Sequence, residues 1–279
     1  MMQKLYPGGK AKAFNVTYDD GVLQDVRFVE MLNKYGIKGT FNLNSGLMQQ
    51  EFEWTHECGM VVKRLTEDVV KELYHGHEVA SHTFTHPYMY SLSEEEIMHE
   101  LLHDKFHLQK LFGRKISGFA IPFDYYSDLI EKCVKDCAFE YARISEESYS
   151  YTPGTDYYRW KAGIFHLSAE LEAYVEGFLK TSEELALCQI VGHTYDLDAE
   201  SMWDKMEAIF KKIAACNDVL PMTNLELVRY LKALRNATAQ EGVLENSSDM
   251  DLWFNIDGVT KVLRPGDYFV LGMRKELDV

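Results

Sequence analysis

The chain has 279 residues, of which 46% are hydrophobic and 26% charged, and its formal net charge is −15. This length suits one large domain with room for a small appendage, and the composition excludes a disordered or fibrous protein. The negative charge argues against nucleic acid and anionic membranes as partners, because both are bound through Lys and Arg. A neutral or cationic substrate fits the charge better, and a homo-oligomer remains open.

The five cysteines are scattered and odd in number, so the pattern favours reduced core thiols over disulfides or a zinc knuckle. Residues 1–14 lack the apolar segment of a signal peptide, and no apolar run is long enough to span a membrane. The sequence as given therefore predicts a cytoplasmic protein, although a trimmed secreted form would show the same features.

Apolar runs alternate with amphipathic stretches along the first 235 residues. Strands are predicted near 12–18, 38–44, 77–82, 116–121, 140–145, 164–168, 185–191 and 219–222. Helices are predicted near 23–35, 66–75, 93–112, 127–138, 170–180, 199–214 and 224–235. Strands that alternate with helices indicate a parallel α/β sheet with right-handed crossovers, and eight strands favour a barrel over an open sheet.

The pattern changes after about residue 242. Alternation over Leu252–Ile256, the hairpin signal Asp257-Gly258 and a turn at 264–267 predict antiparallel strands, the last at Tyr268–Met273. The predicted division is thus a barrel over 1–241 and a small β appendage over 242–279. The appendage shows no chemistry and is expected to cover a barrel face or an edge.

Polar side chains follow several of the predicted strands. Asp19 and Asp20 end the first strand, and two adjacent carboxylates repel each other unless a cation or a proton lies between them. His82 and His86 follow the third strand, and two imidazoles with a carboxylate make a first-row metal site with open positions. Because strand ends converge in such a barrel, these four residues are expected to meet Pro122, Phe123 and His193.

These blocks resemble a known family, the polysaccharide deacetylases with a NodB-homology domain (carbohydrate esterase family 4), over most of residues 10–235. The first two family motifs closely resemble Tyr18-Asp19-Asp20-Gly21 and His82-Thr83-Phe84-Thr85-His86-Pro87. The other three resemble Phe119-Ala120-Ile121-Pro122-Phe123, more weakly Tyr158-Arg159-Trp160, and Ile190-Val191-Gly192-His193. The family fold is a distorted (β/α) barrel of seven or eight strands, which agrees with the strand count.

The resemblance implies a role for each matched residue. Asp20, His82 and His86 would hold one divalent metal, with zinc expected first and cobalt, nickel, iron or manganese compatible with the same ligands. Asp19 would be the general base that deprotonates water, and His193 would protonate the leaving group. The backbone N–H of Phe123 would help to hold the oxyanion.

Two residues depart from the third family motif. Ala120 replaces the usual arginine that pairs with the base, and Asp124 replaces a usual glycine. Either Arg159 takes over the arginine's role, or the base is tuned differently. The expected substrate-binding residues are those that lie near the motifs and offer rings: Tyr88, Pro122, Phe123, Tyr125, Trp160 and Tyr195.

A rival motif is His99-Glu100-Leu101-Leu102-His103, which matches the HExxH signature of zinc peptidases. On a predicted helix, His99 and His103 lie roughly opposite the apolar side that carries Leu101 and Leu108. These histidines are therefore expected to face solvent on an outer helix, away from any enclosed site. The pattern thus argues against a zinc peptidase.

The sequence thus predicts a metal-dependent hydrolase that removes an acetyl or similar acyl group from a carbohydrate nitrogen or oxygen. Two alternatives stay open: a C–N hydrolase of a small non-peptide amide, and a catalytically weak sugar-binding relative. The loops near 45–65 and 146–162 are expected to shape the substrate pocket.

Overall fold

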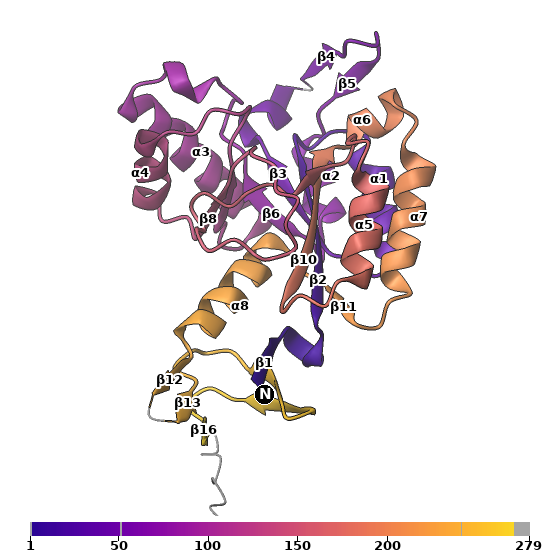
Figure 1. Cartoon of the computed structure of the whole chain (residues 1–279). Helices are drawn as coiled ribbons and strands as arrows, with labels where there is room; N and C mark the ends of the chain where they lie inside the picture. Colours follow the sequence, from indigo (N-terminus) through magenta and orange to yellow (C-terminus); the bar gives the residue numbers. More distant parts are fainter. Residues whose placement is uncertain (1, 51, 241, 271–279) are drawn as a thin grey trace, which may run out of the picture.

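The structure, a computed structural model, describes residues 2–50, 52–240 and 242–270 and is built on an eight-stranded parallel sheet (Figure 1). Its strands are β2 (Lys12–Asp19), β3 (Gly39–Leu43), β6 (Glu78–Ser81), β7 (Gly118–Ala120), β8 (Tyr141–Arg143), β9 (Ile164–Phe165), β10 (Ala186–His193) and β11 (Val219–Pro221). The eight predicted strands are therefore confirmed, each shifted by no more than a few residues.

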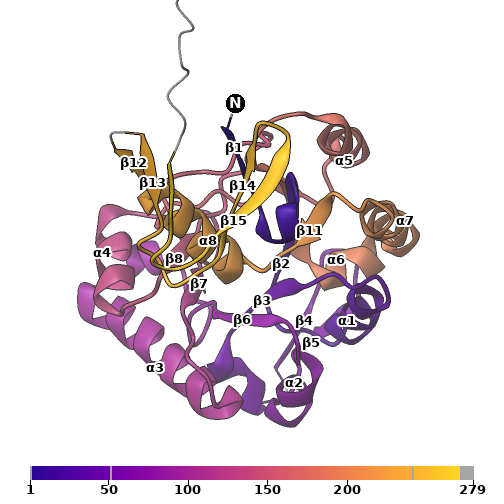
Figure 2. The same cartoon turned by 90° about the horizontal axis from the view of Figure 1, so that it is seen from below.

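Helices cover the outside of the curled sheet, as Figure 2 shows in a view from below. The helices are α1 (Asp25–Lys34), α2 (Glu67–Leu73), α3 (Glu94–Phe112), α4 (Asp128–Asp136), α5 (Leu171–Lys180), α6 (Thr194–Ala199), α7 (Trp203–Ala214) and α8 (Asn224–Asn236). Of these, α8 lies under the sheet, in the middle of that view. Short 3-10 turns are η1 (Pro7–Gly9), η2 (Ser45–Gln50) and η3 (Met89–Ser91). The helix predicted near 199–214 is preceded by α6, which the sequence analysis did not separate. No described helix combines the length and apolarity that crossing a bilayer requires.

The strand order β8-β7-β6-β3-β2-β10-β9, with β11 on β2, explains how the barrel is distorted. β10 pairs with β2 along its whole length, from Ala186 beside Lys12 to His193 beside Asp19. On the other edge of β2, β3 takes the upper part at Val16 to Asp19, and β11 pairs only with the lower part, at Lys12 to Phe14. The sheet is a curled half-barrel with helices outside, which confirms the predicted fold class.

The strand β2 is the centre of the core, and all eight of its residues are buried. The Tyr18 ring lies 4.1 Å from that of Phe28 on α1, which in turn contacts Phe41 of β3 and Phe210 of α7. Burying a large apolar side chain stabilises a fold by about 1.5–3 kcal/mol. The strand that ends at Asp19 is therefore held firmly on both faces, and the residues after it have a fixed starting point.

The appendage is a pair of small antiparallel sheets below the barrel. One joins β1 (Met2–Leu5), β14 (Leu252–Ile256) and β15 (Val259–Leu263), and the other joins β12 (Thr238–Gln240), β13 (Val243–Glu245) and β16 (Tyr268–Val270). Asp257 and Gly258 both have positive φ, so the predicted hairpin is confirmed. The participation of β1 was not predicted, and the division at residue 242 stays a prediction. The predicted strand residues beyond Val270 lie outside the described ones.

A second short hairpin, β4 (Glu53–Thr55) with β5 (Val61–Lys63), stands at the upper end of the barrel beside α6. The Trp54 ring lies 5.4 Å from the Tyr195 ring of α6, edge to face. The chain then returns inward, because Arg64, which follows β5, is buried. This insertion brings residues of the 45–65 loop to the same end of the sheet as Asp19 and Asp20.

Candidate metal centre and active site

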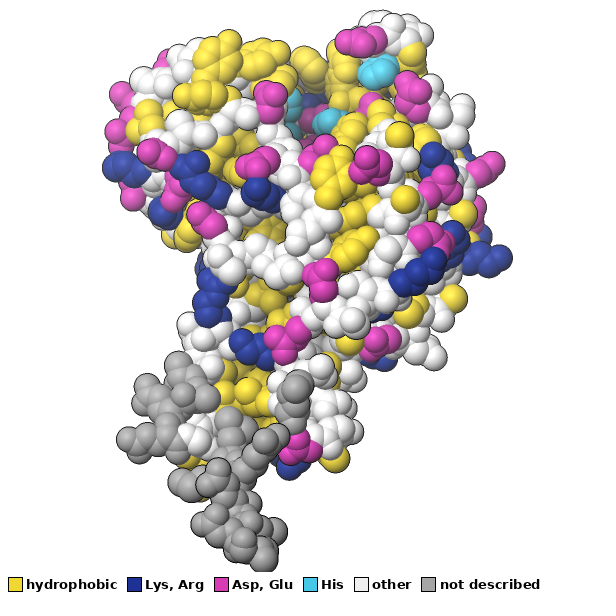
Figure 3. All heavy atoms as spheres, viewed as in Figure 1, with side chains coloured by type: hydrophobic (Ala, Val, Ile, Leu, Met, Phe, Trp, Pro, Cys, Tyr) yellow, Lys and Arg dark blue, Asp and Glu magenta, His cyan; other side chains and the backbone are white. Residues whose placement is uncertain are grey.

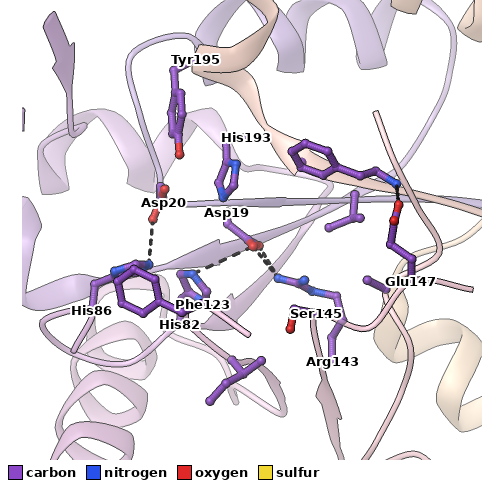
Figure 4. Close-up of a pocket in the computed structure, with 15 residues that line it drawn as sticks. Asp19, Asp20, His82, His86, Phe123, Arg143, Ser145, Glu147, His193 and Tyr195 are labelled. Carbon is purple, nitrogen blue, oxygen red and sulfur yellow. Dashed lines mark hydrogen bonds and ion pairs between the residues drawn. The ribbon is translucent and has the colours of Figure 1, made fainter. Parts of the chain in front are cut away.

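The residues predicted at the strand ends meet in one pocket of about 440 Å³ at the carboxyl end of the sheet. Its lining includes Asp19, Asp20, His82, His86 and His193 (Figure 4). Figure 3 shows the hollow from outside, with histidine side chains inside it. The predicted convergence of these five residues is therefore present in the structure.

Asp20, His82 and His86 form a compact set of potential metal ligands. One ligand atom of each lies within 4.8 Å of the others, and His86 Nε2 is 3.6 Å from Asp20 Oδ1. His82 Nδ1 donates to the backbone oxygen of Ala120 at 2.8 Å, which leaves the lone pair of Nε2 directed into the set. Burial lowers the pKa of His82 to about 4 and also lowers that of His86, so both rings are neutral, the form that binds metals.

The carboxylate of this ligand set, Asp20, has an unusual neighbour, the guanidinium of Arg64. Burial alone would raise the pKa of Asp20, but the charge of Arg64 and of nearby histidines holds it well below its usual range. Arg64 Nη2 lies 3.0 Å from Asp20 Oδ1, yet that oxygen is buried and has no hydrogen-bond partner of good geometry among the described residues. Asp20 is therefore ionised and keeps acceptor capacity for a cation.

Backbone strain is concentrated at this site. Asp20, Thr83, His86 and Phe123 all have φ between 56° and 86°, a left-handed region that non-glycine residues rarely adopt. His86 N donates to Thr83 Oγ1 at 3.1 Å, and the side chain of Asn44 donates to the Thr83 carbonyl at 3.0 Å. Such conformations cost about 1–3 kcal/mol each and persist where the surroundings enforce them. Their clustering supports a functional role for the loops that carry these residues.

The helix α3 supports the histidine loop from behind. Glu100 accepts hydrogen bonds from Thr85 N and Thr85 Oγ1, both at 2.8 Å. One turn later, Asp104 accepts from Ser45 and, at 2.5 Å, from Ser81 Oγ at the end of β6. The inward acids of this helix therefore hold the segment between His82 and His86.

The histidines of the HExxH motif lie on the other side of that helix. His99 and His103 are exposed, and their rings stack on each other at 3.8 Å. The prediction that they face solvent is confirmed. Glu100, which a peptidase would need beside its zinc, points away from them and into the support of Thr85.

Asp19 is held by a residue that the sequence analysis did not name, Arg143. Its Nη2 lies 2.5 and 2.6 Å from the two Asp19 oxygens, and Asn42 Nδ2 donates to Oδ1 at 2.7 Å. Burial would raise the pKa of Asp19, but the charge of Arg143, with those of His82 and His193, lowers it. Arg143 is the register partner of Ala120 on the adjacent strand, so the guanidinium comes from β8 instead of β7.

Arg159 does not occupy this position, and the expectation that it replaces the motif arginine is wrong. Its Nε donates to Glu131 at 2.6 Å and its Nη2 to Asp128 at 2.5 Å, both on α4. These two carboxylates satisfy the guanidinium at the surface, whereas Arg143 already neutralises Asp19.

His193 is oriented by a carboxylate three residues later. Its Nδ1 donates to Asp196 Oδ2 at 3.1 Å, and Nε2 of the buried His166 lies 3.4 Å from the same oxygen. Burial would raise the pKa of Asp196, but His166 and His193 lower it to about 2. Burial would lower the pKa of His193, but Asp196 and the two pocket aspartates raise it above its ordinary value. His193 is therefore suited to carry a proton at neutral pH.

Space for this arrangement depends on a glycine. A Cβ on Gly192 would lie 2.3 Å from Nδ1 of His166, so only glycine admits the ring. The same nitrogen is 2.9 Å from the Tyr18 hydroxyl, which donates when His166 Nε2 carries the proton. The chain Tyr18, His166, Asp196 and His193 thus links the end of β2 to the pocket.

Comparison with known proteins agrees with these features. Residues 7–142 match the sequence model of the polysaccharide deacetylase family. That segment is therefore similar to the polysaccharide deacetylases. The resemblance predicted from the motifs is confirmed. No curated protein sequence matches the chain.

Several solved structures share the deacetylase fold. One, from Mycobacterium smegmatis, is classed with the polysaccharide deacetylases and has a TM-score of 0.60 at 14% sequence identity. The match covers 84% of this chain and 94% of the Mycobacterium smegmatis chain. A Clostridium thermocellum family 4 acetyl xylan esterase, in complex with a cobalt ion, has a TM-score of 0.51 at 16% identity, with coverages of 79% and 91%. A variant of BA3943, a family 4 pseudoenzyme of Bacillus anthracis, with restored activity, has a TM-score of 0.53 at 17% identity, with coverages of 81% and 70%. At these identities the likeness shows the fold alone.

The aromatic residues expected to bind substrate in this deacetylase-family fold are placed differently from one another. Phe123 and Tyr195 line the pocket. Tyr88 and Tyr125 lie outside it and are exposed, whereas Pro122 is buried and is not among the described lining residues.

The expectation for Trp160 is wrong. It is only 2% exposed, and its ring stacks on Tyr157 in the core between the barrel and α8. A side chain enclosed in this way cannot stack on a sugar.

Proposed function

We propose that the protein is a metal-dependent hydrolase that removes an acetyl group, linked through nitrogen or oxygen, from a carbohydrate. The observation that carries the proposal is the meeting of a two-histidine, one-carboxylate set with a second, ionised aspartate and a proton-bearing histidine in one pocket. The family match supports the same reaction class.

The residues present fit a divalent metal. Two neutral imidazoles and a carboxylate are a common set for zinc and its neighbours, and Asp20 Oδ1 is buried without a hydrogen bond of good geometry. Asp20, His82 and His86 would hold the ion. When bound, it would supply a Lewis acid for the acetyl carbonyl and would lower the pKa of water.

Asp19 is proposed as the general base. Its lowered pKa keeps it ionised near neutral pH, so it can accept a proton from the water that attacks the acetyl carbon. Arg143 and Asn42 hold the carboxylate beside the proposed ligands, which fixes the direction from which it accepts the proton. Correct placement of such a group typically contributes 10²- to 10⁴-fold in rate.

His193 is proposed as the general acid. Asp196 orients the ring and favours its protonated form, so that it can donate a proton to the nitrogen or oxygen of the sugar as the bond to the acetyl carbon breaks. Acetate and the free amine or hydroxyl are the products. The backbone N–H of Phe123, in its left-handed conformation at the pocket wall, is proposed to stabilise the oxyanion.

The alternatives are weighed by two observations. A weak sugar-binding relative was considered because Ala120 replaces the motif arginine, but Arg143 supplies a guanidinium to Asp19 from the neighbouring strand. This favours an active enzyme. A hydrolase of a small amide would use the same groups, and the choice between the two depends on the surface beside the pocket.

The test combines metal content with acetate release. Purified protein is analysed for bound metal, then assayed with acetylated chito-oligosaccharides and acetylated xylan after loading with zinc or cobalt. Asp19→Asn is expected to keep the metal while losing at least 10²-fold in kcat. If Asp19→Asn loses the metal instead, the division of roles between Asp19 and Asp20 is wrong. Absence of acetate release from any substrate by the loaded protein would overturn the proposal.

A further inference from the structure

The guanidinium of Arg64 lies beside the carboxylate that is proposed to bind the metal. Arg64 is 7% exposed, and its Nη2 lies 3.0 Å from Asp20 Oδ1. His86 Nε2 lies 3.6 Å from the same oxygen, and Figure 4 marks this contact. Asp20 Oδ1 therefore has both a fixed positive charge and a proposed metal ligand as neighbours.

The hairpin of β4 and β5 delivers this charge. Arg64 follows β5 directly, and its backbone pairs in an isolated antiparallel bridge with Val22, which closely follows Asp20 in the chain. Its Nη1 donates a hydrogen bond to the backbone oxygen of Asp20, and the centroid of the Trp54 ring on β4 lies 5.3 Å from Arg64 Cζ. The guanidinium is thus fixed to the same turn that carries the proposed ligand.

Arg64 also connects Asp20 to the loop of the ligand histidines. Its Nη1 donates to Asn44 Oδ1 at 2.6 Å. Asn44 Nδ2 in turn donates to the backbone oxygen of His82 and, at 3.0 Å, to that of Thr83. One guanidinium therefore joins the turn after β2, the segment after β3 and the loop after β6. Groups of the chain itself hold the proposed ligands Asp20 and His82 in one arrangement.

The pair with Arg64 differs from the other buried ion pair of the pocket. Arg143 Nη2 lies 2.5 and 2.6 Å from the two oxygens of Asp19, close enough for charge-assisted hydrogen bonds. Asp20 Oδ1, in contrast, is buried and has no hydrogen bond of good geometry among the described residues. Arg64 therefore supplies charge to Asp20 but leaves acceptor capacity on the oxygen that a metal would use.

A fixed cation at Asp20 has two consequences for a metal at the same carboxylate. It stabilises a buried negative charge that would be strongly destabilising without a partner. It also repels a second cation on that carboxylate, because like charges interact strongly where water is excluded. Arg64 thus stabilises the metal-free protein and opposes metal binding.

We propose that Arg64 competes with the metal for Asp20. The guanidinium keeps the ligand set assembled and the protein folded without metal. It also makes metal binding weaker and more readily reversible than the same three ligands would give alone. Arg64 is a positioning residue, since it acts through Asp20 and Asn44 and not on the substrate. The inference rests on the proposed function, to whose metal centre it adds a control of metal occupancy.

The test titrates the metal-free, full-length protein with zinc and with cobalt in a calorimeter. Arg64→Met removes the charge, so its metal dissociation constant should be lower than that of the native protein by about 10-fold or more. Without metal, its melting temperature should be lower by about 5 °C or more, because the buried carboxylate has lost its cation. Saturating zinc should then raise the melting temperature of the variant more than that of the native protein. A purely structural arginine would lower the melting temperature equally with and without zinc.

Two further variants are the controls. Arg159→Met also removes one positive charge, but this side chain is 37% exposed and is paired with Asp128 and Glu131 on α4. Its metal dissociation constant should stay within about 2-fold of the native value, because a distant exposed charge is screened. Arg64→Lys keeps the charge and loses the planar fork that reaches both Asp20 and Asn44. It should bind metal within about 3-fold of the native protein, since the charge is what competes.

Metal binding and acetate release together separate the two proposals. If Arg64→Met binds metal no more tightly than the native protein, or if Arg64→Lys binds as tightly as Arg64→Met, the competition is wrong while the proposed function stands. Arg64→Met that stays unfolded in saturating zinc also overturns the competition, because the ion then cannot replace the guanidinium. Tighter binding by Arg64→Met without acetate release from any loaded protein supports the competition and overturns the proposed function alone. Metal bound by neither protein overturns the metal centre on which both proposals rest.

Discussion

Two histidine pairs with the same spacing have opposite surroundings in this molecule. His82 and His86 follow a buried strand, and their side chains are 2% and 21% exposed beside the carboxylate of Asp20. His99 and His103 stack on each other on the exposed face of α3. Spacing alone therefore does not make a metal site. The difference lies in burial, in a carboxylate at the meeting point and in the hydrogen bond from His82 Nδ1 to the backbone of Ala120.

The helix α3 connects the two pairs physically. Its outer face carries His99 and His103, while its inner face carries Glu100 and Asp104, which hold the loop of the first pair. Glu100 of the HExxH sequence thus supports the proposed metal site from the inner face of the helix. Variants on the two faces of one helix, and at the two histidine pairs, can test this comparison directly.

The largest effect is expected from the first histidine pair. His82→Ala removes one of three proposed ligands and should weaken zinc or cobalt binding by at least 100-fold, because two ligands cannot enclose the ion. His99→Ala, whose partner His103 is also four residues away, should leave the metal dissociation constant within 2-fold. Calorimetric titration of the metal-free proteins measures both. Equal losses in the two variants, or a loss only in His99→Ala, would contradict the comparison.

A second contrast concerns two arginines, one buried in the site and one at the surface. Arg143→Met leaves the Asp19 carboxylate buried without its cation, and kcat should fall about 100-fold, the lower end of what a correctly placed general base contributes. Because the charge of Arg143 lowers the pKa of Asp19, that pKa should rise in this variant, and the acid limb of the pH profile should move to higher pH. Arg159→Met should keep both kcat and the pH profile. A normal profile in Arg143→Met would show that Asp19 is not the base.

The inner face of α3 is expected to have a smaller effect. Glu100→Ala removes both acceptors of Thr85 and should weaken metal binding about 10-fold, the lower range for residues that orient ligands. Glu100→Gln retains one acceptor and should recover most of the loss. Glu95→Ala, an exposed glutamate of the same helix, is the control. The same metal dissociation constant in all three variants would show that α3 does not support the site.

Most of the barrel could be predicted from the sequence, because strand and helix periods are local properties. Gly113 ends α3 in a left-handed conformation and Ser93 caps its start, as the capping box predicts. The pairing of β10 with one whole edge of β2, and of β11 with the other edge below β3, could not be predicted, since it depends on how whole strands pack. The same holds for β1, whose partner β14 is about 250 residues away in sequence.

The candidate site was predicted where motifs were contiguous and missed where partners come from neighbouring elements. Arg143 carried a usable signal, because it is a charged residue at the carboxyl end of a strand, where the other site residues also lie. Asp196 also carried one, at three residues from His193. His166 and Arg64 carried none, since only the folded chain brings them to Asp196 and Asp20.

The smallest effect on function is expected at Asp25, a buried carboxylate that, unlike Asp20, has no guanidinium beside it among the described residues. Burial raises its pKa to about 7, while Tyr74 donates a hydrogen bond to it at 2.5 Å. Because the folded pKa exceeds the unfolded one, the folded protein binds more protons between about pH 4 and 7, and this group's contribution to the free energy of unfolding falls as pH rises through that window. Asp25→Asn resembles the protonated acid, so the slope of its free energy of unfolding against pH should differ by up to ~1.4 kcal/mol per pH unit. Its kcat should stay within 2-fold.

Denaturant titrations of the native protein, Asp25→Asn and the control Asp249→Asn, at an exposed position, measure this difference at pH 4, 5.5, 7 and 8.5. Parallel pH dependence in all three proteins would mean that burial without a cation does not keep Asp25 protonated, and the role given to burial in separating the two histidine pairs would weaken with it.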